Sequence, residues 1–137
     1  MDRFQHYIDG AFDDGSAHFE SLDPATGTPW AVMPAATVHD VDRAVRAADR
    51  AFCSAAWAGL TATARGKLLL RLADLVQAAA PQLAALETRD TGKIIRETSA
   101  QIAYVADYYR YYAGLADKIE GAHLPIDKPD MEVWLRR

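Results

Sequence analysis

The sequence predicts a mostly α-helical chain with short N-terminal β-hairpins and an incomplete C-terminal strand. Residues 1–36 alternate short apolar runs with turn signals, and residues 37–121 repeat apolar residues at helical spacing. Residues 122–137 have the pattern of an extended segment that begins a strand. The chain has 137 residues, 50% of them apolar and 25% charged, which is the size and composition of one globular domain.

The composition also limits the classes of partner. The formal net charge is −4 with acidic and basic residues interspersed, so there is no basic face for nucleic acid and no polybasic patch for a membrane surface. No apolar run approaches the ~20 residues of a membrane span, and the N-terminus lacks the pattern of a secretory signal. A single cysteine excludes an intrachain disulfide. We therefore expect a cytoplasmic protein with neither nucleic-acid nor membrane partners.

The first part of the chain is expected to form short strands and turns. The dipeptide Asp9-Gly10 separates two short runs and is the pair that best supplies the positive φ angles of a tight hairpin. A second strand over residues 19–22 is followed by the turn sequence 23–27, where proline fixes φ and glycine releases the return. Residues 30–33 then form the returning strand.

The helical part is expected to begin at Thr37, where Asp40 three residues later provides a capping box with Asp in place of the usual Glu. The apolar residues of this helix recur at helical spacing, so we expect them to form its inward stripe, with Arg43 among the charged residues that face away. The stripe comprises Val41, Ala44, Val45, Ala48 and Phe52. The helix is expected to end near residues 54–57.

A second helix is expected to be capped by Thr61 or Thr63 and to bury a leucine-rich face. Pro81 either ends this helix or begins a short third helix as its first residue, because proline lacks the N–H that an interior helical position needs. In the third helix Leu83 and Leu86 would lie on the apolar side.

The octet 86–93, Leu-Glu-Thr-Arg-Asp-Thr-Gly-Lys, is expected to be the turn between this short helix and the next. Asp90 and Thr91 have side chains suited to capping a helix, and Gly92 can take a positive φ angle without steric cost.

The fourth helix is expected to extend from Ile94 to Ile119, roughly 39 Å at 1.5 Å per residue. Its five tyrosines lie between Tyr104 and Tyr112. We interpret them as packing surface, because the basic groove that accompanies base stacking is absent.

The residue pattern alone gives no catalytic machinery. Cys53 is the only thiol, and it has neither a neighbouring histidine nor a glycine elbow, so we expect a partly buried structural cysteine. The histidines are scattered and predict no metal or base cluster. Glu87, Asp90 and Glu97 gather near the turn, where a solvated, helix-capping role is expected. On this evidence the chain could be a non-catalytic helical module that docks a separately encoded partner through its tyrosine-rich helix.

The octet also resembles the E-T-x-D-x-G-K segment of NAD(P)-dependent aldehyde dehydrogenases. Five further motifs resemble this family in the right order over about 130 residues. They are Tyr-Ile-Asp-Gly at 7–10, Leu-Asp-Pro-Ala-Thr-Gly at 22–27, Asp-Val-Asp-Arg-Ala-Val at 40–45, Arg-Gly-Lys-Leu-Leu at 65–69 and Ala-Asp-Tyr-Tyr-Arg-Tyr-Tyr-Ala-Gly at 106–114. The chain is thus similar to the N-terminal region of this family.

The resemblance implies an α/β fold in which residues 1–137 are the N-terminal part of the coenzyme-binding domain. Residues 122–137 would begin a strand of the bridging, oligomerising region, and the full-length protein would be a homo-oligomer, a dimer or tetramer. Such enzymes oxidise an aldehyde to a carboxylic acid with NAD or NADP through a cysteine thiohemiacetal and a thioester. By this resemblance the chain holds no catalytic and no cofactor-binding residue. Cys53 does not match the context of the nucleophile, so we expect the chain alone to be inactive.

One site is implied within the chain. Some members of the family hold a structural monovalent cation, Na+ or K+, with backbone carbonyls before the Asn-Pro turn and the aspartate of the E-T-x-D segment. The matching positions here are Ser21, Leu22 and Asp90. The alternative for Asp90 is that it only caps a helix.

Overall fold

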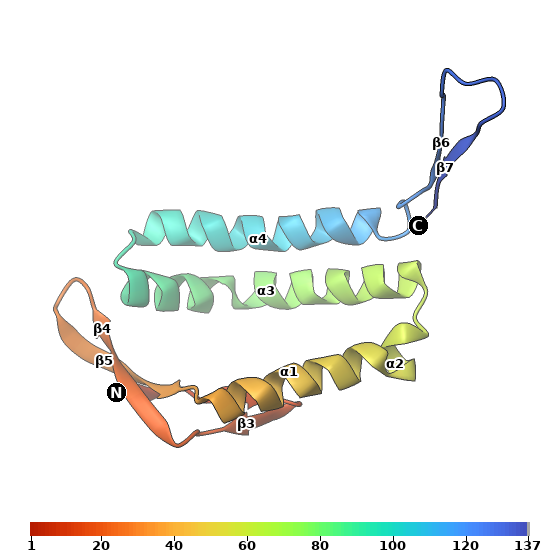
Figure 1. The fold of residues 1–137 in the computed structure, drawn as a ribbon. Helices are drawn as coiled ribbons and strands as arrows, with labels where there is room; N and C mark the ends of the chain where they lie inside the picture. The colour runs from red at the N-terminus through yellow and green to blue at the C-terminus, as the bar shows by residue number, and fades with distance from the viewer. Residues whose placement is uncertain (137) are drawn as a thin grey trace.

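The computed structural model describes residues 1–136, and its centre is a pair of long antiparallel helices (Figure 1). These are α3 (Ala62–Thr91) and α4 (Ile95–Leu115). Helices α1 (Val38–Cys53) and α2 (Ala55–Ala58) lie along the α3 side. Strands β4 and β5 lie near the end where α3 turns into α4, and a C-terminal hairpin projects from the opposite end (Figure 1).

The N-terminal strands confirm both predicted strand pairs. Asp9 and Gly10 take φ angles of 55° and 79°, and Gly27 takes 69° in the second turn. The first strand, Asp2–Arg3, pairs in parallel with the fifth strand. It was not predicted, because two residues are too few to show a strand pattern in the sequence. The strands are β1 (Asp2–Arg3), β2 (His6–Ile8), β3 (Ala11–Asp13), β4 (Ala17–Asp23) and β5 (Thr28–Ala35), in two sheets ordered β1-β5-β4 and β2-β3.

The capping box at the start of α1 is confirmed. The Thr37 hydroxyl accepts a hydrogen bond from the Asp40 N–H at 3.2 Å, and the Asp40 carboxylate accepts one from the Thr37 N–H at 2.9 Å. The N–H groups of Thr37 and Asp40 have no partner within the helix, and each is satisfied by the side chain of the other residue.

The predicted inward stripe of α1 is wrong for its larger members. Val41, Val45 and Phe52 are 54%, 61% and 69% exposed. The face nearest the β2-β3 hairpin instead carries the buried Ala47 and the half-buried Ala44, and Arg43 on this side donates to Asp13 at 2.6 Å. This ion pair joins α1 to β3 across thirty residues of sequence.

The prediction that Pro81 ends one helix or begins another is also wrong, because α3 is a single helix of 30 residues with Pro81 inside it. Proline removes one backbone hydrogen bond from a helix interior. Here Ala73 before it and Ala84 after it are both completely buried, so packing against α4 fixes the helix on either side.

Helices α3 and α4 approach closely because small residues line their contact. A Cβ added at Gly66 would lie 2.8 Å from the Ala113 carbonyl oxygen. Thr88 and Thr98 hydroxyls hydrogen-bond across the other end at 2.7 Å. The close approach accounts for the burial of alanines rather than leucines along this seam.

Helix α4 is shorter than predicted and ends at Leu115, which gives 21 residues instead of a helix to Ile119. At 1.5 Å per residue it is roughly 32 Å long. Gly66, four residues into α3, already faces Ala113 and Ala116. Residues after this point of α4 lie beyond the first turn of α3 and have little of that helix to pack against. The apolar spacing of residues 116–119 is not enough to keep them helical without this packing.

The C-terminal part is extended, as predicted. β6 (Ala122–Leu124) pairs antiparallel with β7 (Val133–Leu135), and the His123 and Trp134 rings stack with centroids 4.4 Å apart. The strand predicted as incomplete therefore has a partner within the chain. None of the helices within residues 1–136 is both long and apolar enough for a membrane span.

Candidate functional site

The octet 86–93 forms the last turn of α3 and the link into α4. Gly92 ends α3 in the left-handed conformation with φ of 74°, as predicted, and its N–H donates to the Thr88 carbonyl at 2.9 Å. The prediction of Asp90 and Thr91 as capping turn residues is wrong, because both still belong to α3. Thr91 donates its hydroxyl back to the Glu87 carbonyl at 2.6 Å.

Asp90 meets Ser21 at this junction. The Ser21 hydroxyl, on β4, donates to Oδ1 of Asp90 at 2.6 Å across 69 residues of sequence. Oδ2 of Asp90 has no hydrogen-bond or ion-pair partner within residues 1–136. The alternative that Asp90 caps a helix is wrong, since Ile94 takes the N-cap position of α4 without a side-chain hydrogen bond.

The backbone beside Ser21 is irregular. A β-bulge falls between Ser21 and Leu22, and Leu22 faces Pro29 on β5. Proline has no N–H to donate to a carbonyl opposite it, and a bulge interrupts the ladder locally. The strand thus leaves its regular hydrogen bonding at the two carbonyls that the sequence analysis singled out.

Close packing fixes this junction. A Cβ on Gly92 would approach the Pro24 side chain to 3.1 Å, so the turn after β4 lies directly against the end of α3. The Arg89 guanidinium lies 5.0 Å from the centre of the Trp30 ring, within the range of a cation–π contact. Lys93 donates to Glu87 at 2.6 Å. A cation site at this junction would therefore have the Asp90 carboxylate and the β4 carbonyls held in fixed positions.

Cys53 is exposed, which corrects the expectation of a partly buried thiol. Its sulfur lies 4.0 Å from the Asp49 carboxylate, and a neighbouring negative charge does not stabilise a thiolate. Among the described residues no group of three or more His, Cys, Asp or Glu side chains is arranged to hold a metal ion.

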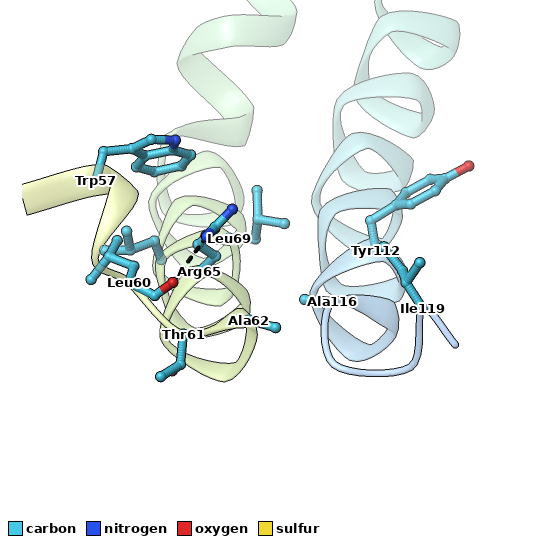
Figure 2. Close-up of a pocket in the computed structure, with 10 residues that line it drawn as sticks. Trp57, Leu60, Thr61, Ala62, Arg65, Leu69, Tyr112, Ala116 and Ile119 are labelled. Carbon is cyan, nitrogen blue, oxygen red and sulfur yellow. Dashed lines mark hydrogen bonds between the residues drawn. The ribbon is translucent and has the colours of Figure 1, made fainter. Parts of the chain in front are cut away.

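The sequence patterns do not indicate a groove that lies at the other end of the α3-α4 pair. A groove of about 920 Å³ lies where α2 and the start of α3 meet the end of α4 (Figure 2). In the sequence Arg65 belongs to a helix-start motif and Trp57 to the expected end of the first helix, and neither position indicates a groove. The groove forms from segments some fifty residues apart, so no local pattern could reveal it.

Residues 12–137 match the profile of the family described as "Aldehyde dehydrogenase family". The chain belongs to this family. A curated aldehyde dehydrogenase relative, (Z)-2-((N-methylformamido)methylene)-5-hydroxybutyrolactone dehydrogenase of Acinetobacter baylyi, is 66% identical over all 137 residues. The chain spans 28% of that relative's length.

Solved structures of aldehyde dehydrogenases agree with this assignment. The chain superposes on an aldehyde dehydrogenase of Bacillus cereus with a TM-score of 0.86 and 36% identity, covering 97% of this chain and 28% of that one. A betaine aldehyde dehydrogenase of Staphylococcus aureus in complex with NAD+ gives 0.81 and 35%, covering 93% and 26%. The matches confirm the aldehyde dehydrogenase-like α/β fold and give no support to the alternative of a stand-alone interaction module.

Proposed function

We propose that residues 1–137 are the N-terminal part of the coenzyme-binding domain of an NAD(P)-dependent aldehyde dehydrogenase that oxidises an aldehyde to a carboxylic acid. The observation that carries this proposal is the 66% identity over the whole chain to a named dehydrogenase. The structural likeness to an enzyme bound to NAD+ supports a nicotinamide cofactor, and NAD in preference to NADP.

The described residues would contribute scaffold rather than chemistry. In this reaction class NAD(P)+ accepts a hydride and a cysteine thiolate supplies the nucleophile. Cys53 is unsuited to that role, because it is exposed at the end of α1 beside a carboxylate. The α3-α4 pair and the strands packed on the octet would instead form a rigid part of the coenzyme-binding domain. The catalytic and cofactor-binding residues would come from other parts of the full-length enzyme.

The name of the Acinetobacter baylyi relative suggests a substrate class. A 5-hydroxybutyrolactone is the ring-closed form of a 4-oxo acid, so ring opening exposes an aldehyde three bonds from a carboxylate. We propose that the present protein acts on an aldehyde masked in this way. At 66% identity the relative is close enough for a shared substrate class to be the first hypothesis to test.

A chimera tests the function directly. Residues 1–137 would replace the matched 28% of the Acinetobacter baylyi relative, and NADH formation would be followed at 340 nm. We expect turnover of the hydroxybutyrolactone within about tenfold of the relative's own, and none from residues 1–137 alone. A correctly folded chimera without activity, or turnover by the chain alone, would contradict the proposal.

We also propose that a structural Na+ or K+ binds at Ser21, Leu22 and Asp90. Carbonyl and carboxylate oxygens suit a hard cation, and the short Ser21–Asp90 contact and the bulge before Leu22 support the fit. In this arrangement the ion would lie between the two carbonyls and the carboxylate and would join β4 to α3.

The cation proposal predicts an ion-specific stabilisation. Melting in 0.2 M KCl or NaCl should occur several degrees above melting in 0.2 M choline chloride. The Asp90→Asn variant should lose this difference, while Asp23→Asn, in the neighbouring turn, should keep it. Equal melting temperatures in all three salts would rule out the site.

Two further parts of the proposal concern assembly and location. We propose that residues 122–137 begin a bridging strand and that the full-length enzyme is a homo-oligomer; the exposed apolar side chains of Leu124, Met131 and Trp134 support a covered surface there. A cytoplasmic location is consistent with the single cysteine.

A further inference from the structure

The groove between α2, α3 and α4 has one wall that is almost entirely apolar. Trp57 and Leu60 form one side, and Tyr112 and Ile119 come from α4 and the segment after it (Figure 2). The remaining lining residues are Thr61, Ala62, Arg65, Leu68, Leu69 and Ala116. A volume of about 920 Å³ lies within the 300–1,000 Å³ range usual for small-molecule sites.

Arg65 is the single formal charge in this lining. It forms no ion pair with any of residues 1–136. Its Nη2 donates to the Leu60 carbonyl at 2.9 Å, and its guanidinium lies 5.8 Å from the centre of the Trp57 ring. These contacts orient the guanidinium at the groove while leaving most of its donors unused.

We propose that this groove binds an amphipathic organic carboxylate, with the carboxylate on Arg65 and the apolar part between α3 and α4. The charge selects the ligand class: a guanidinium fork pairs with a carboxylate through two parallel hydrogen bonds. The apolar part of the ligand follows from the rest of the lining, because Leu68 and Leu69 offer only apolar side chains to a chain of medium length.

Among residues 1–136 no acidic residue lines the groove, so a cationic or zwitterionic ligand finds no partner there. A neutral ligand would bury the same apolar area but leave the Arg65 donors to water. The expected order of affinity is therefore octanoate first, then octanol, then octylamine. This inference does not depend on the proposed reaction, because it rests on the lining of the groove alone.

Calorimetric titration of the 137-residue chain with octanoate, octanol and octylamine tests the proposal. We expect octanoate to bind at least tenfold more tightly than octanol, with no detectable binding of octylamine. Arg65→Gln should abolish the preference for octanoate over octanol, and Arg65→Lys should keep part of it. Arg71→Gln, an exposed cation on the same helix outside the groove, is the matched control and should leave all three affinities unchanged.

Because Arg65 also bonds to Leu60, a second variant guards against loss of folding. Leu69→Glu leaves Arg65 in place but puts a carboxylate four residues along the same helix, within reach of the guanidinium, and it should reduce octanoate binding more than octanol binding. Equal affinities for octanoate and octanol in the unaltered chain would overturn the proposal. So would self-association of the chain that the Leu69→Glu variant abolishes, since a second copy would then occupy the groove.

Discussion

At the scale of single residues, one arginine of α1 joins the start of that helix to β3. Nη2 of Arg43 donates to Asp13 at 2.6 Å and to Asp40 at 2.9 Å. Hydrogen bonds from Thr37, and then from Arg43, hold the pKa of Asp40 well below its usual range. The Gly15 N–H, and then Arg43, lower the pKa of Asp13. Both carboxylates are therefore more easily ionised in the folded state than in the unfolded chain.

This network predicts a loss of stability in acid. A lowered folded-state pKa contributes stability above the unfolded value of about 4, and that contribution is lost as the pH falls towards the folded value. The melting temperature should fall between pH 5 and pH 2.5. Asp40→Asn should flatten this dependence, whereas Asp42→Asn, an exposed carboxylate two residues along the same helix, should not. Parallel pH profiles for Asp40→Asn and the unaltered chain would contradict the assignment.

Gly92 and Gly114 predict opposite responses to the same substitution. Gly92→Ala forces a Cβ into a left-handed position against Pro24 and should destabilise the chain by roughly 1–3 kcal/mol. Gly114 lies inside α4 with nothing within 4 Å of an added Cβ, so Gly114→Ala should stabilise by roughly 0.5–1 kcal/mol. Urea unfolding measures both. A loss of stability in Gly114→Ala would show that this glycine has a packing role.

At the scale of elements, α3 is a helix that tertiary contacts hold together. Pro81 lies exposed in its interior, where proline costs about 3 kcal/mol relative to alanine. The buried faces around Ala73 and Ala84 lie on either side of it. The helix tolerates the free-energy cost of Pro81 because the packing against α4 on both sides of it contributes more stability.

Replacing this proline should therefore stabilise the chain. Pro81→Ala restores an N–H for the helical hydrogen bond, and we expect a gain of roughly 1–3 kcal/mol in the free energy of unfolding. Gln82→Ala, at the next and equally exposed position, should change it by less than about 0.5 kcal/mol. A destabilised Pro81→Ala variant would indicate that the proline ring itself is needed for the fit of α3 on α4.

At the scale of the whole molecule, stability is unevenly distributed. Ala73, Ala84 and Ala106 in the α3-α4 pair are completely buried. Helix α1 buries little more than Ala47 and Asp40, and every described residue of β6 is exposed. Regions with few buried contacts open locally at a lower free energy than the centre.

Hydrogen exchange should report this difference. Amides in the middle of α3 and α4 should be the most protected, and those of α1 and the β6-β7 hairpin should exchange at least tenfold faster. Mass spectrometry of peptic peptides would measure the protection factors. Equal protection of α1 and α3 would mean that α1 is held by contacts beyond those seen here.

How far sequence reasoning reaches depends on the range of the interaction. The Asp9-Gly10 hairpin, the Thr37 capping box and the glycine end of α3 were predicted correctly, because each depends on residues within four positions of one another. For the candidate site, motif order identified Ser21 and Asp90, but no local pattern could show that their side chains touch. The continuous α3 and the early end of α4 were missed because interhelical packing decides both.

The sequence by itself determined the family, the strand and helix types and the residues of the junction, since these depend on local conformational preference and on an ordered series of motifs. Tertiary structure alone decided which face of α1 is covered, that Pro81 remains within a helix, and that Arg65 lies at a groove with a largely apolar lining. The octet shows both effects. Its glycine ends the helix by local geometry, whereas Asp90 acquires its partner only when β4 folds against α3. Contacts between residues far apart in sequence leave no periodic signal, because their free energy arises only once the elements pack.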